Sequence, residues 1–264
     1  MKKFLLLSGA LLALLSATSC TQWYGLNDYL RVKVDADGNH GIYRGEEEVV
    51  PTEYQSFQVV DAPRSNFLAS REIYDTYVIG KKADGCDLWR IGRTSMSEVL
   101  LYSAPEIEPL DIEPHENYGY ARKLYVGTLA DGKKEVYNRF ARPHKSGPYD
   151  EVYPGVEEWI FRVGDKWGLK HISNKGTEAK YDQVYIFDCY ERLYYLKRNN
   201  QYELYYYNYD ELSYIGIVNQ QEIDELMPLV SKQYSPYSFH IETQDIPKDM
   251  LRKIKIRTGN TWLL

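Results

Sequence analysis

The chain has few of the residues on which metal and nucleophile chemistry depends, with 3 cysteines and 5 histidines in 264 residues. No His-x-x-x-His spacing, Gly-x-Ser-x-Gly motif or phosphate-cradling glycine loop is present. Paired carboxylates for sugar hydrolysis cannot be picked out of 38 acidic residues without distances. We therefore expect no metal and no cofactor, and the sequence points to no catalytic residue. The histidines are His40, His115, His144, His171 and His240.

An excess of positive charge is also missing. The chain carries 32 Lys and Arg against 38 Asp and Glu, a formal net charge of −6. Proteins bind the phosphates of nucleic acids mainly through Lys and Arg. The acidic balance therefore argues against a nucleic acid partner.

Long apolar runs are absent except near the start. Phe4 to Leu15 is an almost wholly apolar stretch of twelve residues, whereas a membrane-spanning helix needs about 20. Preceded by Met1-Lys2-Lys3 and followed by small residues, this stretch predicts a secretion signal over 1–19. Its removal takes Lys2 and Lys3 but no acid, so the mature charge becomes 30 − 38 = −8.

The residues Ala17-Thr18-Ser19 lead directly into Cys20. Small residues in front of a cysteine resemble the lipobox of bacterial lipoproteins. This resemblance implies that Cys20 is lipidated and becomes the mature N-terminus, with 20–27 as a tether and the membrane as a partner through the lipid. In some lipoproteins, a run of acidic residues after the lipidated cysteine resembles a surface-export signal. Thr21-Gln22-Trp23 contains no acidic residue. We therefore expect the periplasmic side of the outer membrane rather than the cell surface.

The other two cysteines, Cys86 and Cys189, would then lie in an oxidising compartment. They could form a disulfide, which by the chain-entropy model would contribute roughly 4–5 kcal/mol for a loop of about 100 residues. The alternative is two buried, unpaired thiols that act as small apolar side chains. Neither belongs to a Cys-x-x-Cys pair, so the spacing leaves both alternatives open.

Tyrosine is abundant, with 26 residues, and favours half-buried β surfaces. The tripeptide Ala-Asp-Gly recurs at intervals of 47 residues (84 − 37 and 131 − 84). Asp-Gly between apolar runs predicts a hairpin with a type I′ turn, which requires positive φ at both central residues. Gly164-Asp165 and Asn199-Asn200 provide two further turns. The three repeated pairs are Asp37-Gly38, Asp84-Gly85 and Asp131-Gly132.

The residues that flank these five turns also agree. At every turn, two flanking positions are apolar or aromatic. They are the fifth residue before the first turn residue and the fourth residue after the second turn residue. This agreement predicts two strands that share an inner face. The fold class is therefore all-β: an array of about five β-hairpin repeats over 28–218, either propeller-like or a solenoid. The flanking residues are Val32, Ile79, Val126, Trp159 and Tyr194 before the turns, and Ile42, Trp89, Val136, Leu169 and Leu204 after them.

A second repeat follows the hairpins. Tyr149-Asp150-Glu151-Val152-Tyr153 and Tyr181-Asp182-Gln183-Val184-Tyr185 are near copies. They predict a corner at which the tyrosine packs inward and the Asp carboxylate accepts backbone N–H groups. Together with Trp167-Gly168, Gly176 and the Tyr181-Asp182 corner, this segment resembles the bacterial WG repeat. The resemblance implies an all-β repeat scaffold rather than a particular reaction.

The pattern changes over 219–264. Asn219 and Glu222 resemble a capping box in front of a helix, which Pro228 would kink or end. Thr243 could cap a second helix through Leu251. The alternation of Lys and Ile over 253–257 predicts an edge strand.

One segment also has the spacing of a calcium loop. Asp35, Asp37, Asn39 and Glu46 fit the ligand positions of an EF-hand. However, His40 stands where glycine makes the sharp turn, and the flanking residues are typical of strands. The hairpin is the better interpretation.

The last candidate is a binding surface. In Leu204-Tyr205-Tyr206-Tyr207-Asn208-Tyr209, the repeat register places Leu204 inside and Tyr205, Tyr207 and Tyr209 outside. Such a strip could bind a glycan or an envelope protein, although an alternative is a tyrosine ladder covered by a neighbouring element. The favoured function is a non-enzymatic binding or assembly module. The alternative is a glycan-processing hydrolase with paired carboxylates in a Tyr-lined groove.

Overall fold

The computed structural model describes residues 22–61, 75–93, 98–110, 124–139, 144–155, 158–189, 192–208 and 211–259. The chain divides into two compact units, Met1–Ser103 and Ala104–Leu264. This division falls inside the predicted repeat domain of 28–218. None of the helices in the described residues has the length and apolar character needed to cross a membrane.

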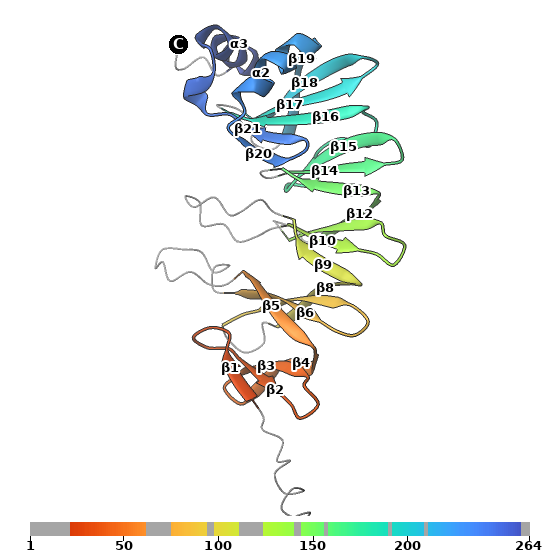
Figure 1. Cartoon of the computed structure of the whole chain (residues 1–264), viewed down its shortest axis with the longest axis vertical. Coiled ribbons are helices and arrows are strands. Elements are labelled where there is room, and N and C mark those ends of the chain that lie inside the picture. Colours follow the sequence, from red (N-terminus) through yellow and green to blue (C-terminus); the bar gives the residue numbers. More distant parts are fainter. Residues whose placement is uncertain are drawn as a thin grey trace, which may run out of the picture. The chain divides into compact units, whose positions relative to one another are not determined.

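The first unit contains two antiparallel sheets in which successive strands are neighbours (Figure 1). The first sheet has the order β1-β2-β3-β4 and the second the order β5-β6-β7-β8. Their strands are β1 (Gln22–Gly25), β2 (Arg31–Val34), β3 (His40–Arg44), β4 (Glu47–Tyr54), β5 (Ser56–Asp61), β6 (Thr76–Lys81), β7 (Cys86–Ile91) and β8 (Val99–Ala104).

The second unit contains three sheets. The third sheet has the order β12-β11-β10-β9, the fourth β13-β14-β15, and the fifth β19-β18-β17-β16-β21-β20. The strands of the third and fourth sheets are β9 (Glu106–Pro109), β10 (Leu124–Thr128), β11 (Lys134–Asn138), β12 (His144–Tyr149), β13 (Glu151–Pro154), β14 (Glu158–Val163) and β15 (Lys166–His171). The strands of the fifth sheet are β16 (Gln183–Asp188), β17 (Arg192–Arg198), β18 (Gln201–Asn208), β19 (Glu211–Val218), β20 (Lys232–Ser235) and β21 (Ser238–His240).

Each sheet holds one of the five predicted hairpins, so the all-β hairpin fold class is confirmed. The turn type differs from the prediction at all three Asp-Gly pairs, because only the glycine of each pair has positive φ. The φ values of Gly38 and Gly132 are 84° and 82°. Each ends a three-residue loop, because Val32 pairs with Ile42 and Val126 with Val136. A type I turn closed by a left-handed glycine replaces the expected type I′ turn.

The prediction that the flanking residues share one inner face is wrong in three of the hairpins. The two-residue loop of β14–β15 pairs Ile160 with Leu169, so Trp159 and Leu169 lie on opposite faces. The same offset holds in β6–β7 and β17–β18. A shift of one residue turns a side chain to the other side of a sheet. Only Asn199-Asn200 has two positive φ values, 51° and 61°, as a type I′ turn requires.

Both faces of the central strands are apolar because consecutive sheets share their cores. Val32 and Ile42 of the first sheet pack with Val78 and Ile91 of the second. In the second unit, one cluster joins the third and fourth sheets, including Val136 and Trp159, and another joins the fourth and fifth. Sheets of three or four strands obtain their stability from this contact with a neighbour.

The Tyr-Asp corners connect one hairpin turn to the next. Tyr149 and Tyr181 are buried, as expected. The Asp150 carboxylate accepts hydrogen bonds from the Lys133 ammonium at 2.7 Å and from the Gly164 N–H at 2.6 Å.

Asp182 repeats this arrangement. It accepts a bond from the Lys166 ammonium at 2.7 Å and one from the N–H of Asn199. Each carboxylate therefore links the turn of one sheet to the turn of the following sheet.

Gly168 of the Trp-Gly pair is required by close packing. A Cβ at this position would lie 2.5 Å from the Cζ atom of Phe161 and 2.9 Å from the carbonyl oxygen of Glu178. A side chain would therefore displace the Phe161 ring, which belongs to the core between the third and fourth sheets. The neighbouring Trp167 exchanges backbone hydrogen bonds with Tyr181 at 2.7 and 3.0 Å.

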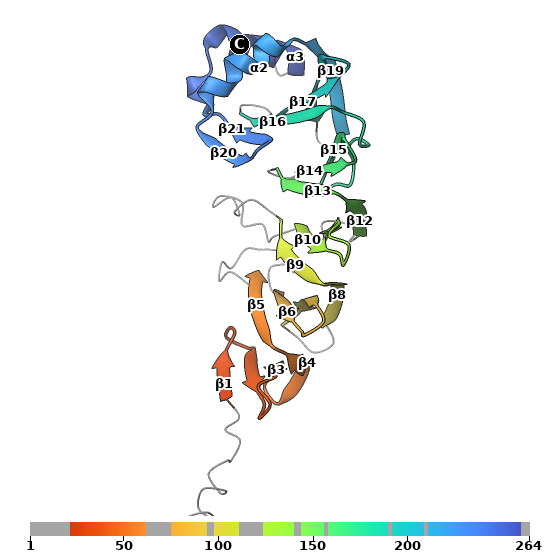
Figure 2. The same cartoon turned by 45° about the vertical axis from the view of Figure 1, so that its right-hand side comes forward.

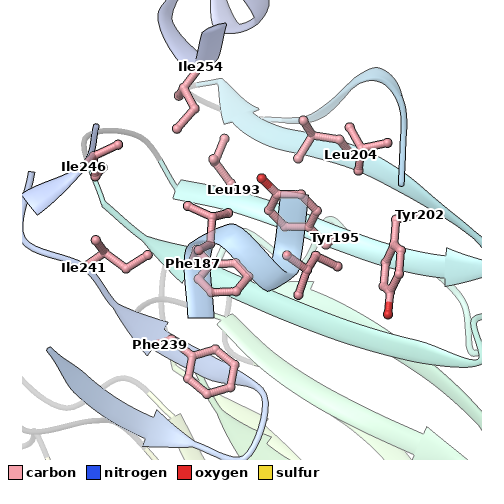
Figure 3. Packing of buried hydrophobic residues seen from close by; sticks show 12 residues of the cluster. Phe187, Leu193, Tyr195, Tyr202, Leu204, Phe239, Ile241, Ile246 and Ile254 are labelled. Carbon is pink, nitrogen blue, oxygen red and sulfur yellow. The ribbon is translucent and has the colours of Figure 1, made fainter. Parts of the chain in front are cut away.

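The C-terminal segment packs on the fifth sheet (Figure 2). It begins with α2 (Gln220–Leu226), which Asn219 precedes without a side-chain capping bond, and which passes at Pro228 into η2 (Met227–Leu229). After β20, β21 and η3 (Thr243–Asp245) comes α3 (Lys248–Thr258). Phe187, Leu193 and Tyr195 of the sheet lie together with Ile246 and Ile254 in one cluster (Figure 3).

The predicted edge strand over 253–257 is wrong, because these residues belong to α3. The alternation of Lys and Ile suggested a period of two, but Met250 and Ile254 face the core at helical spacing while Ile256 is 55% exposed. Gly259, with φ of 72°, ends the helix in a left-handed conformation.

The corner carboxylates predict how stability depends on pH. Lys133 and the Gly164 N–H lower the pKa of Asp150, and Lys166 lowers the pKa of Asp182. A group with a lowered folded-state pKa stabilises fully above its unfolded pKa of about 3.9, and its contribution is lost as the pH falls further. We expect the urea concentration at the unfolding midpoint of the wild type to decrease as the pH is lowered below about 4. The decrease should be smaller in Asp150→Asn/Asp182→Asn. Asp165→Asn, at a side chain 87% exposed, is the matched control. Identical pH profiles for all three proteins would contradict the role of the corners.

Candidate functional site

Two of the three tyrosines predicted to form an exposed strip, Tyr205 and Tyr207, are half-buried. Tyr205 and Tyr207 lie on the opposite face of β18 from Leu204, as expected, but they pack against the core between the fourth and fifth sheets. The Tyr205 hydroxyl donates to Glu203 at 2.8 Å, and Tyr207 stacks on His171 with ring centroids 3.9 Å apart. Burial, then hydrogen bonds with Tyr181 and Glu203, raise the pKa of Tyr205.

At Tyr205 and Tyr207, the predicted exposed strip is thus corrected to rings that pack against the preceding sheet. Tyr209, like Cys20, lies outside the described residues.

A different group of aromatic residues reaches the surface of the second unit. We define the aromatic patch as Tyr153 of β13, Trp167 of β15 and Tyr237 of the β20–β21 turn. The ring centroid of Tyr237 lies 4.5 Å from that of Trp167 and 5.1 Å from that of Tyr153. Trp167 is 9% exposed and forms the floor, while the two tyrosines are half-buried.

Charged side chains border the aromatic patch. The Arg162 guanidinium lies 5.9 Å from the centroid of the Trp167 ring and forms an ion pair with Glu151. The Tyr153 hydroxyl donates to the same Glu151 carboxylate at 3.0 Å. Burial, and then Glu151, raise the pKa of Tyr153, so its phenol stays protonated at neutral pH. The patch therefore combines apolar ring faces with a cation, an anion and neutral hydroxyls.

Backbone pairing holds the rings of the patch in place. Tyr153 pairs with Ile160, and Trp167 with Arg162. The carbonyl oxygen of Tyr237 accepts a hydrogen bond from the Ile186 N–H at 2.8 Å. The backbone under the three rings is hydrogen-bonded and the rings contact one another, so less ordering is left for a ligand to impose.

Sequence reasoning singled out Trp167 and Tyr153 through the Trp-Gly pair and the corner, but it missed Tyr237. This residue joins the patch only because β21 pairs in parallel with β16, a contact between segments about 50 residues apart for which the sequence carries no signal.

A network of charged side chains lies between the fourth and fifth sheets. The Arg192 guanidinium contacts Glu158 at 2.8 Å and Asp188 at 3.6 Å. The other oxygen of Asp188 lies 3.1 Å from Nδ1 of His240. Register places Asp188 beside Arg192 on one side and beside His240 on the other.

This network brings two carboxylates near each other, as a hydrolase would need. Both carboxylates, however, are bridged by the same guanidinium. Glu158 is fully buried, and its Oε1 atom accepts bonds from both Arg192 and the Tyr194 hydroxyl. Burial, and then the Glu158 charge, raise the pKa of Tyr194 well above its usual value. These contacts fit an ion-pair network that joins two sheets.

The remaining predicted residues are not brought together. Cys86 is a free, half-buried thiol at the start of β7, and Cys189 belongs to the other unit. The two cysteines therefore form no disulfide in this structure. The Asp35 carboxylate accepts the N–H groups of Asp37 and Asn39 inside the first hairpin loop. Within the described part of the chain, no group of three or more His, Cys, Asp and Glu is arranged to hold a metal ion.

Comparison with known proteins gives little likeness in sequence. No protein-family model matches the chain, and no curated protein matches it. Among solved structures, TolB from Acinetobacter baumannii is similar over 69% of this chain, with 9% identity and a TM-score of 0.29. The match covers 49% of that chain, so this protein aligns with about half of its length.

The charged network predicts a large effect from a single truncation. Glu158→Ala leaves the Arg192 guanidinium without its fully buried partner, and breaking a buried ion pair costs about 3–5 kcal/mol. We expect the free energy of unfolding to decrease by about 3 kcal/mol, near the lower end of this range, because Asp188 still faces Arg192. Urea unfolding measures this change. The control is Glu242→Ala, at a side chain 49% exposed that contacts His240. Equal losses in the two variants would contradict the network.

Proposed function

We propose that this protein is a lipid-anchored envelope lipoprotein that acts as a non-enzymatic binding or assembly module, with the aromatic patch as its contact surface. The observation that carries the proposal is the convergence of Tyr153, Trp167 and Tyr237 from separate elements beside the Arg162–Glu151 ion pair. Convergent, pre-formed rings with a few polar groups at the rim are typical of a binding surface.

The chemistry of the patch favours a neutral ligand rich in hydroxyl groups, such as an envelope glycan. The apolar face of a sugar ring would pack on the tyrosines, Arg162 would donate hydrogen bonds, and Glu151 would accept them. The net negative charge makes a polyanionic ligand a poorer fit. An envelope protein is the second partner class that the same surface could bind.

The anchor part of the proposal is supported by the sequence. Cys20 follows a short apolar core and small residues, which resemble a lipobox, and the segment from Trp167 to Asp182 resembles a WG repeat. We place the protein on the periplasmic side of the outer membrane. A glycan-processing hydrolase remains the alternative from the enzyme class, but the engagement of Glu158 and Asp188 by Arg192 gives it no support.

The anchor has a direct test. Wild-type protein, expressed in a bacterial host that is fed a radiolabelled fatty acid, is expected to incorporate the label and to fractionate with the outer membrane. Cys20→Ser is expected to lose both. Label on the Cys20→Ser protein would refute lipidation at this residue.

The binding role predicts that Tyr237→Ala weakens capture of purified cell-wall glycan fragments about tenfold, because loss of one stacked ring removes ~1–1.5 kcal/mol. Isothermal titration with a lipid-free form that begins after Cys20 measures the affinity. Tyr234→Ala is the matched control, since Tyr234 lies on the adjacent β20 and its ring contacts His240 rather than the patch. Unchanged affinity in Tyr237→Ala would remove the patch from the proposal.

A further inference from the structure

The outer face of the first sheet carries a second group of aromatic and charged side chains. Strand register places Trp23 opposite Lys33, and Arg31 opposite Tyr43. Directly paired residues and residues two apart share a face, so all four side chains lie on one side. We call them the headgroup patch. Val32 and Ile42, which alternate with them, are fully buried on the other side.

The headgroup patch combines an exposed ring with two cations. Trp23 is 41% exposed, and its ring centroid lies 4.9 Å from the Arg31 guanidinium carbon and 5.8 Å from the Lys33 ammonium. The same ammonium lies 5.2 Å from the Tyr43 ring, which meets Trp23 edge-on at 5.3 Å. Cation–π contacts keep these charges beside the rings.

Acidic groups balance the cations. Glu48 accepts a hydrogen bond from the Tyr43 hydroxyl at 3.0 Å. The hydrogen bond from the Thr52 side chain, then that from Tyr43 and the charge of Lys33, lower the pKa of Glu48. Glu46 lies 3.8 Å from Arg31 and is almost fully exposed. The surface is therefore amphipathic and close to neutral, which suits a zwitterionic headgroup better than a strongly charged ligand.

The position of this sheet in the chain identifies what covers it. Only three residue steps separate Cys20 from Trp23, so the two Cα atoms can lie at most about 11 Å apart. The polar layer on each side of a bilayer is roughly 5–8 Å thick. With acyl chains on Cys20 inside the hydrocarbon, Trp23 must lie in the headgroup layer or directly above it.

We propose that the headgroup patch docks onto the phospholipid headgroups of the membrane that holds the anchor. This inference rests on the lipid anchor proposed above. Tryptophan and tyrosine favour the membrane interface, and Arg and Lys extend from there to lipid phosphates. The acyl chains attach the protein, and the patch fixes how the first sheet meets the membrane.

Bromine quenching tests this contact. The mature lipidated protein is reconstituted into vesicles of phosphatidylethanolamine and phosphatidylglycerol, with or without brominated phospholipid, and tryptophan emission is recorded. We expect brominated lipid to reduce the emission of the wild type. The reduction should be lost in Trp23→Phe and kept in Trp167→Phe, because Trp167 is buried in the second unit.

The outcomes separate the inference from the anchor on which it rests. Protein that floats with the vesicles but shows the same bromine-dependent loss in wild type and Trp23→Phe would overturn the docking contact alone. Protein that does not float with vesicles would overturn the anchor and the contact together. A partial return of emission in Arg31→Ala/Lys33→Ala, with flotation unchanged, would support the role of the two cations.

Discussion

In the described part of the chain, each sheet shares a core with a neighbour in the same unit, and the fold depends on these shared cores. The consequence is visible in single strands. Trp159 and Phe161 contribute to the core with the third sheet, while Ile160 between them contributes to the core with the fifth. Strands with two buried faces read as continuous apolar runs, which explains why hydrophobic alternation is weak in this sequence.

Much of the fold could be predicted from the turns, because Asp-Gly and Asn-Asn pairs have few other uses between apolar segments. Loop length could not be predicted. The loop at Gly38 has three residues and that at Gly164 has two, and this one-residue difference decides which face each flanking residue occupies. The later part of α3 was predicted as a strand because Lys and Ile alternate over 253–257, and only packing against the fifth sheet selects the helical period.

The candidate site was predictable only in part. Its floor, Trp167, stands in a recognisable motif, whereas Tyr237 arrives through a parallel strand pairing that no local pattern encodes. Alternation placed Tyr205 on the correct face, but whether a face is exposed depends on what packs against it, and the covering residues come from the preceding sheet. The ion pair of Glu158 with Arg192 likewise joins residues 34 apart. Contacts of this kind are properties of the assembled sheets.

The carboxylates of Asp150 and Asp182 have a consequence for how such a protein can change in length. Each spans from the turn of one hairpin to the turn of the next, so neighbouring turns must stay at a fixed spacing. Extra residues within a hairpin would pull its turn away from the acid that holds it. Insertion or loss of one complete sheet together with its corner would leave every such spacing intact. The changes in length that both corners can accommodate are therefore those that add or remove a complete repeating unit.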